Sequence, residues 1–146
     1  MSEDVATFAH STPDRPRASE VMRGLPVSPG EVEARACLVR SPDDGGALEP
    51  GGVLVAHATD PAWTPLFARA SGIVVELGGL LSHAATVARE YGIPCVANVE
   101  RATALLRDGD VVRVDGSRGE VVVIARARPA SEVQLNQMGV LCRGGP

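Results

Sequence analysis

Short apolar runs alternate with helix signals through the middle of this chain, and this alternation constrains the fold more than any other feature. The apolar runs lie at residues 53–57 (VLVAH), 72–76 (GIVVE) and 94–99 (PCVANV), and each one predicts a buried strand. Strands that alternate with helices are typical of a sheet with helices packed on it. The middle of the chain therefore predicts an α/β fold.

The helices expected between these strands have recognisable ends. Asp60 is a good N-cap and Pro61 suits the first helical position, so a helix is expected to run from there to Ala70. A second helix is expected over residues 83–91, where Gly92 ends it. A third segment, 100–109, predicts a short helix or turn.

Further strands are expected on both sides of this middle part. Residues 34–40 (ARACLVR) predict a strand, and the Pro-, Gly- and Asp-rich segment 41–52 predicts a loop. Residues 111–115 and 120–125 flank GSRG and predict a closing β-hairpin. The expected fold is a mixed sheet with a few short helices packed on it.

The 146 residues fit one domain of common size, here expected over residues 24–126. Residues 1–23 are polar, contain two prolines and show no period, so they predict a mobile lead-in. Residues 127–146 have a weak apolar pattern and a Gly-rich end, which predicts a tail or short helix.

Composition excludes several classes of function. A net charge of −4 argues against nucleic acid as the main partner. No apolar run approaches ~18 residues, so no membrane span is expected, and no secretory signal is visible. The three cysteines are far apart and indicate no disulfide framework, so a reducing cytoplasm is expected. No metal site is expected, because the cysteines form no CxxC pair and the carboxylates form no cluster. The chain has no lysine, which excludes a P-loop and lysine Schiff-base chemistry.

One segment, GGLLSHAATVAREYGIP at residues 78–94, carries the residues that chemistry could use. Gly78 and Gly79 permit a tight turn, and Ser82 can cap the helix that follows. His83 would then lie in the first helical turn. Free N–H groups and the positive end of the helix dipole favour an anion there and oppose a cation. These residues alone predict a plausible anion site, and they equally allow His83 and Ser82 to be purely structural.

The same segment resembles the signature of the mobile, phosphohistidine-carrying domain of the enzymes that use phosphoenolpyruvate (PEP). This family includes phosphoenolpyruvate synthase, pyruvate phosphate dikinase, enzyme I of the sugar phosphotransferase system and rifampin phosphotransferase. The matching positions are Gly78, Gly79, Ser82, His83, Ala88, Arg89, Gly92 and Pro94. Residues 27–39, 59–79 and 107–124 also resemble the family, so the similarity covers roughly residues 24–126.

The resemblance implies a swivelling domain whose histidine, His83, accepts a phosphoryl group through Nε2 and relays it between two active sites. Ser82 and the backbone around Gly79 would support the phosphate, and Arg89 would have a secondary role at most. Thr86, at i+3 from His83, shares its helix face, so it is expected either to donate to the phosphate or to be an ordinary surface residue. The family also implies partners, namely an ATP-grasp nucleotide-binding domain or subunit and a PEP- or substrate-binding one. Mg and ATP or PEP would then lie on those partners, with no cofactor on this chain.

Two departures limit this reading. A chain of this length has no room for either partner domain, so it is not expected to be a complete enzyme alone. His57 is expected to be an exposed loop residue rather than a second catalytic histidine. The alternative function is a non-catalytic docking or anion-binding module that keeps the swivelling fold.

Overall fold

The computed structural model of the chain describes residues 21–127, which form a mixed eight-stranded sheet with short helices. The strands are β1 Val21–Arg23, β2 Leu25–Ser28, β3 Glu31–Leu38, β4 Val53–Ala56, β5 Gly72–Val75, β6 Cys95–Ala97, β7 Val111–Asp115 and β8 Glu120–Ala125. The helices are α2 Thr64–Phe67, α3 His83–Tyr91 and α4 Ala102–Leu105, with 3₁₀ turns η1 Pro42–Ala47 and η2 Pro61–Trp63. The predicted α/β class with a mixed sheet is confirmed.

The long strand β3 joins two halves of the sheet, whose order is β1-β8-β7-β3-β4-β5-β6-β2. Residues 31–35 of β3 pair antiparallel with β7, whereas residues 36–38 pair parallel with β4. The antiparallel half is completed by β8 and β1, and the parallel half by β5 and β6. β2 closes the far edge by pairing antiparallel with β6.

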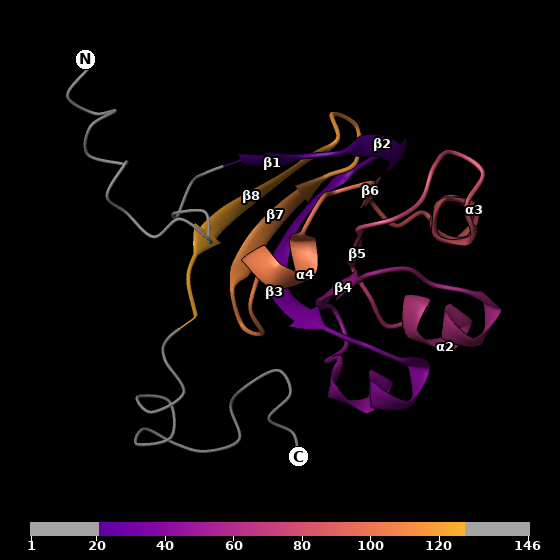
Figure 1. Ribbon diagram of the computed structural model, residues 1–146, viewed down its shortest axis with the longest axis horizontal. Coiled ribbons are helices and arrows are strands. Elements are labelled where there is room, and N and C mark those ends of the chain that lie inside the picture. The colour runs from indigo at the N-terminus through magenta and orange to yellow at the C-terminus, as the bar shows by residue number, and fades with distance from the viewer. Residues whose placement is uncertain (1–20, 128–146) are drawn as a thin grey trace.

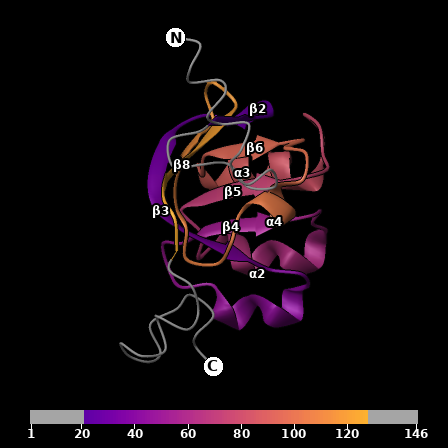
Figure 2. The ribbon, with the colours of Figure 1, turned by 60° about the vertical axis from the view of Figure 1, so that its left-hand side comes forward.

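Three layers result from this arrangement, because the two halves of the sheet face each other. Alternate valines of β4 to β8 meet in one core, which includes Val55, Val74, Val114 and Val123. The opposite face of the parallel half packs against α2 and α3, in a second core. Figures 1 and 2 show the β7–β8 hairpin on one side of β4, β5 and β6 and the helices α2 and α3 on the other. Because the parallel strands are buried on both faces, they read in the sequence as unbroken apolar runs.

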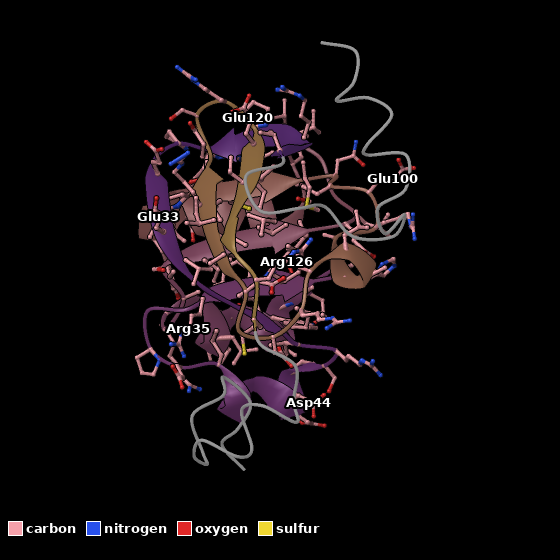
Figure 3. All side chains as sticks on the ribbon, turned by 90° about the vertical axis from the view of Figure 1, so that its left-hand side faces the viewer. Glu33, Arg35, Asp44, Glu100, Glu120 and Arg126 are labelled. Carbon is pink, nitrogen blue, oxygen red and sulfur yellow. The ribbon has the colours of Figure 1, made fainter. Side chains whose placement is uncertain are left out.

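The ends of α4 and β8 are tied together by a buried acidic residue. Asp110 is fully buried, and its carboxylate accepts hydrogen bonds from Arg126 Nη1 (2.9 Å), Arg107 N (3.0 Å) and Ala127 N (2.7 Å). Figure 3 shows Arg126 at the end of β8, beside α4. A buried charge is tolerated when it is paired and hydrogen-bonded in this way.

The structure corrects three expectations. Residues 21–23, expected in the lead-in, form strand β1 because they pair with β8, and β2 was not predicted at all. Strand β3 begins at Glu31 rather than at residue 34. The segment 41–52, expected to be a loop, contains η1. The remainder of the predicted lead-in and the predicted tail lie outside the described residues.

The other predicted elements need only shorter bounds. The helix expected from residue 61 to Ala70 is η2 followed by α2, which ends at Phe67. The second helix over residues 83–91 and both hairpin strands are confirmed at the predicted residues. The hairpin turn is held by Asp115, whose Oδ1 accepts from the N–H groups of Ser117 and Arg118, each at 3.0 Å.

Candidate functional site

His83 is the first residue of α3, at the end of the segment 76–82 that leaves strand β5. Ser82 is the N-cap, with extended backbone, and its Oγ accepts a hydrogen bond from Ala85 N (3.3 Å). The same hydroxyl donates to the carbonyl of Gly79 at 2.8 Å. Ser82 therefore fixes both the helix start and the turn before it, so the predicted cap is present.

The two glycines before the helix have different roles. Gly78 has φ +142°, which residues with a side chain rarely adopt, and an added Cβ would lie 3.1 Å from Ser82 Oγ. An added Cβ on Gly79 would meet nothing within 4 Å. Gly78 is thus required by the backbone, whereas Gly79 borders open space and its carbonyl anchors Ser82.

The imidazole of His83 is held by three residues that were not predicted as site residues from the sequence. Thr59 Oγ1 lies 3.0 Å from Nδ1, and Thr64 Oγ1 lies 3.4 Å from Nε2. The buried ring of Phe67 packs edge-on against the imidazole, with centroids 5.5 Å apart and planes at 72°. Thr59 comes from the loop after β4 and Thr64 and Phe67 come from α2, so the segment between β4 and the end of α2 positions the ring.

The unequal distances to the two threonines distinguish the ring nitrogens. At 3.0 Å, Nδ1 has a normal hydrogen bond, while the contact of Nε2 at 3.4 Å is long. In a neutral imidazole one nitrogen carries the proton and the other a free electron pair. A proton on Nδ1, donated to Thr59, leaves the electron pair of Nε2 only weakly engaged.

The hydrogen bonds of Thr86 and Arg89 go to groups other than the ring nitrogens of His83. Thr86 is exposed, and its N–H donates to Ser82 O at 3.0 Å as part of the helix. Arg89 Nη1 donates to Val27 O (2.9 Å), and its Nη2 donates to Leu80 O (3.0 Å). Arg89 therefore ties α3 to β2 and to the segment before the helix.

His57 is exposed in the loop after β4, as predicted, yet it has a partner. Its Nδ1 lies 2.6 Å from Glu76 Oε1, and Glu76 Oε2 accepts from both N and Oγ1 of Thr103, each at 2.6 Å. Burial alone would raise the pKa of Glu76, but the hydrogen bonds from His57 and Thr103 outweigh it and hold that pKa below its ordinary value. Glu76 thus links the loop after β4, the segment before α3 and helix α4.

Beneath α3 lies a thiol that takes no part in this site. Cys95 is fully buried on β6, and burial raises its pKa to about 12, although the charge of Arg89 acts in the opposite direction. A thiol with this pKa stays protonated and unreactive at neutral pH.

Within residues 21–127 no three His, Cys, Asp or Glu side chains gather closely enough to hold a metal ion. In the same part of the chain, no helix has the length and apolar character needed to cross a membrane.

Comparison with known proteins places these residues in a family. Residues 48–119, which include the whole site, match the family described as "PEP-utilising enzyme, mobile domain". The chain is 49% identical over 106 residues to a rifampicin phosphotransferase of Bacillus cereus, covering 73% of this chain and 12% of that protein. It is 44% identical over 112 residues to the prodigiosin synthesizing transferase PigC of Serratia marcescens, covering 76% of this chain and 13% of that protein. The chain therefore corresponds to about an eighth of the length of these relatives.

Solved structures with the same fold have low sequence identity to this chain. A UPF0107 protein solved by NMR superposes with a TM-score of 0.58 at 16% identity, covering 72% of this chain and 99% of that one. Aconitase X of Thermococcus kodakaraensis superposes with a TM-score of 0.54 at 22% identity, covering 71% and 98%. At these identities the likeness concerns the fold alone.

Proposed function

Given that the chain belongs to the family of PEP-utilising enzymes through its mobile domain, we propose that it is a phosphoryl carrier. In this proposal His83 accepts a phosphoryl group at one active site and delivers it at a second, both on other domains or subunits. The two relatives described above are a rifampicin phosphotransferase and a prodigiosin synthesizing transferase, which supports group transfer as the class of reaction. The observation that carries the proposal is the imidazole of His83 at a helix start, with Nε2 only weakly held.

In the first transfer the electron pair of Nε2 attacks the phosphorus of the donor. The N–P bond forms as the P–O bond to the donor breaks, and the leaving oxygen takes that electron pair. The proton stays on Nδ1, which donates a hydrogen bond to Thr59 Oγ1 3.0 Å away. Thr59 thereby holds the ring in the tautomer and orientation that attack requires.

The new phosphoryl group would lie near the start of α3. N–H groups of the first helical turn and the positive end of the helix dipole favour its negative charge. Thr64 can turn its hydroxyl toward a phosphoryl oxygen, because it already lies 3.4 Å from Nε2. Ser82 and Gly79 support the phosphate by fixing the turn, and the hydroxyl of exposed Thr86 is a further donor on this face.

In the second transfer an oxygen of the acceptor attacks the same phosphorus. The N–P bond breaks, its electron pair returns to Nε2, and the proton of the acceptor goes to a base on the partner domain. The partners in this proposal are an ATP-grasp nucleotide-binding domain and a PEP- or substrate-binding domain, and they would bind the Mg and the nucleotide or PEP. The relay is proposed for the cytoplasm, where ATP and PEP are made.

Phosphoryl transfer to the purified chain tests the proposal. The full-length rifampicin phosphotransferase of Bacillus cereus would serve as donor with ATP labelled at the β or the γ phosphate, and phosphoenolpyruvate synthase with labelled PEP as the second donor. The expected result is a label on the 15.1 kDa chain that is labile in acid and stable in base, as phosphohistidine is.

Two variants give the matched comparison. His83→Ala should abolish the label, whereas His57→Ala removes an exposed histidine of the same domain and should retain it. No label from either donor on the wild-type chain would refute the carrier. That outcome would leave the non-catalytic docking or anion-binding module as the better interpretation.

A further inference from the structure

One carboxylate, that of Glu76, connects the three segments that leave the parallel half of the sheet. β4, β5 and β6 are parallel neighbours, so the segments that follow them start at the same edge of the sheet. Glu76 follows β5 directly, and its Oε1 lies 2.6 Å from Nδ1 of His57, which follows β4. Its Oε2 accepts from N and Oγ1 of Thr103, on the helix after β6, each at 2.6 Å. Two of these three segments lead to the candidate site.

The firmly packed end of this connection is α4. Ala102 is fully buried and Leu106, the C-cap, is 1% exposed, and both belong to the core that contains the valines of β7 and β8. Thr103 therefore donates to Glu76 from a fixed position. At the other end the side chain of His57 is 66% exposed, while that of Glu76 is 13% exposed. The carboxylate is thus the link through which a packed helix holds an exposed loop.

The loop held in this way carries Thr59. His57 is fixed twice, since its Nδ1 lies against Glu76 and its carbonyl accepts from Leu77 N at 2.9 Å. Thr59 is two residues further along the chain, a span of at most about 7 Å. Its Oγ1 lies 3.0 Å from Nδ1 of His83. The place of this hydroxyl therefore depends on how the loop is held.

The link from Glu76 is a charge-assisted hydrogen bond. Burial opposes the ionisation of Glu76, but the hydrogen bonds from His57 and Thr103 outweigh burial and hold its pKa below the ordinary value. The carboxylate is therefore ionised at neutral pH and can only accept, so Nδ1 of His57 carries the proton that it donates. Hydrogen bonds to ionised groups are shorter and stronger than neutral ones, in agreement with the 2.6 Å contact.

We propose that Glu76 is a positioning residue for the reaction of His83. Through His57 it holds the loop after β4 where Thr59 accepts a hydrogen bond from Nδ1 of His83, which keeps the electron pair of Nε2 available for attack. An imidazole without this partner can carry its proton on either nitrogen, and a ring with the proton on Nε2 has no electron pair there. The inference rests on the proposed carrier function, in which Nε2 is the reacting atom, and adds a group that acts on it through Thr59.

The tautomer of His83 in the unmodified chain is the first measurement. Long-range proton–nitrogen NMR at about pH 8, where imidazole is neutral, shows which ring nitrogen carries the proton, and His83→Ala assigns the signals. The wild-type chain should carry the proton on Nδ1. Glu76→Ala removes the carboxylate and should show both tautomers. His57→Ala cuts the same link at its exposed end, outside the core, and should show the same mixture even where Glu76→Ala fails to fold.

The rate of phosphorylation by phosphoramidate is the second measurement, followed as the phosphohistidine that His83→Ala lacks. The P–N bond of phosphoramidate breaks as the bond to Nε2 forms, ammonia leaves, and no partner protein is needed. His57→Ala should lower this rate about three- to tenfold. The variant still reaches full labelling, because Nε2 is present. His57→Asn, whose side-chain N–H replaces the Nδ1–H donor, should stay within about twofold of wild type.

A double variant separates positioning from a general loosening of the domain. Thr59→Val combined with His57→Ala should be no slower than Thr59→Val alone, because His57 acts through the hydroxyl that is already absent. Arg23→Met is the matched control. It removes a side-chain ion pair of similar length, 2.7 Å to Glu120, in the antiparallel half of the sheet, and should change neither measurement.

A His57→Ala chain with the wild-type tautomer and the wild-type rate would overturn the positioning role. Effects that multiply in the double variant would also overturn it, since the link would then act on something other than Thr59. Neither measurement uses a partner protein, so both decide the role of Glu76 independently of the enzymatic label. A wild-type chain that takes no label from either enzyme would refute the carrier alone.

Discussion

Replacing Arg89 with methionine should destabilise the protein, although this arginine is exposed and lies six residues from His83. The substitution keeps most of the apolar stem and removes the guanidinium that binds Val27 O at 2.9 Å and Leu80 O at 3.0 Å. These are the contacts that connect α3 to β2 and to the segment before the helix. The substitution therefore measures what the guanidinium itself contributes.

The expected magnitude follows from these two bonds. A hydrogen bond from a charged donor contributes roughly 1.5–3 kcal/mol, less where water can replace it, and ordering an arginine costs up to about 2 kcal/mol. The bond to Val27 O is partly buried and the bond to Leu80 O is exposed, so we expect a net loss of about 1–2 kcal/mol. Against a total stability of roughly 5–15 kcal/mol this is readily measured.

Urea unfolding followed by circular dichroism measures the loss. With a slope of about 2 kcal/mol/M, the midpoint should fall by about 0.5–1 M in Arg89→Met. Arg89→Lys should recover only part of this, because one ammonium cannot reproduce the planar fork that reaches two carbonyls. Arg118→Met is the control: the side chain of Arg118 makes a 4.0 Å surface ion pair, and its loss should cost less than about 0.5 kcal/mol. Equal midpoints for wild type and Arg89→Met would refute the role assigned to the guanidinium.

Three further predictions follow from the site. Thr59→Val should slow phosphorylation of His83 about tenfold and Thr59→Ser should restore it, as measured by labelling rates; equal rates in all three chains would contradict the role of the hydroxyl. Because the pKa of Glu76 is lowered on folding, its contribution to stability is present above about pH 4.5 and is lost as the pH falls through its depressed value. Thermal midpoints between pH 3 and 6 should therefore fall less steeply with acid in Glu76→Gln than in wild type, and parallel curves would exclude this contribution. Cys95 should resist iodoacetamide at pH 8.5 in the folded protein and react in urea, which mass spectrometry of its peptide would detect.

Much of the fold was predictable, because its central strands are buried on both faces. Such strands appear in the sequence as short apolar runs, and β4, β5 and β6 lie within the predicted runs. Helix α3 was predicted at its exact residues, since its cap Ser82 and its terminal Gly92, in the left-handed conformation, are both local signals. The closing hairpin was predictable for the same local reason.

The edge strands were missed because pairing, not local pattern, creates them. β1 has three residues and exists through its register with Val121 and Val122 of β8. β2 contains Pro26 and changes register between Pro26 and Ser28, as an edge strand can. Neither segment has an alternation long enough to identify it in the sequence.

The sequence by itself determined the class of fold, the helix that begins at His83 and the glycine turn that precedes it. These features depend on neighbours in the chain, because caps, turn residues and apolar runs act within a few positions. Only the tertiary structure decided what surrounds the imidazole. The strands β4 and β5 are parallel neighbours, so the segments that follow them lie at the same edge of the sheet. The start of α3 therefore lies beside the loop after β4, which carries Thr59, and beside helix α2, which carries Thr64 and Phe67. These residues are 16 to 24 positions from His83 in the chain, and only sheet pairing brings them into contact with it.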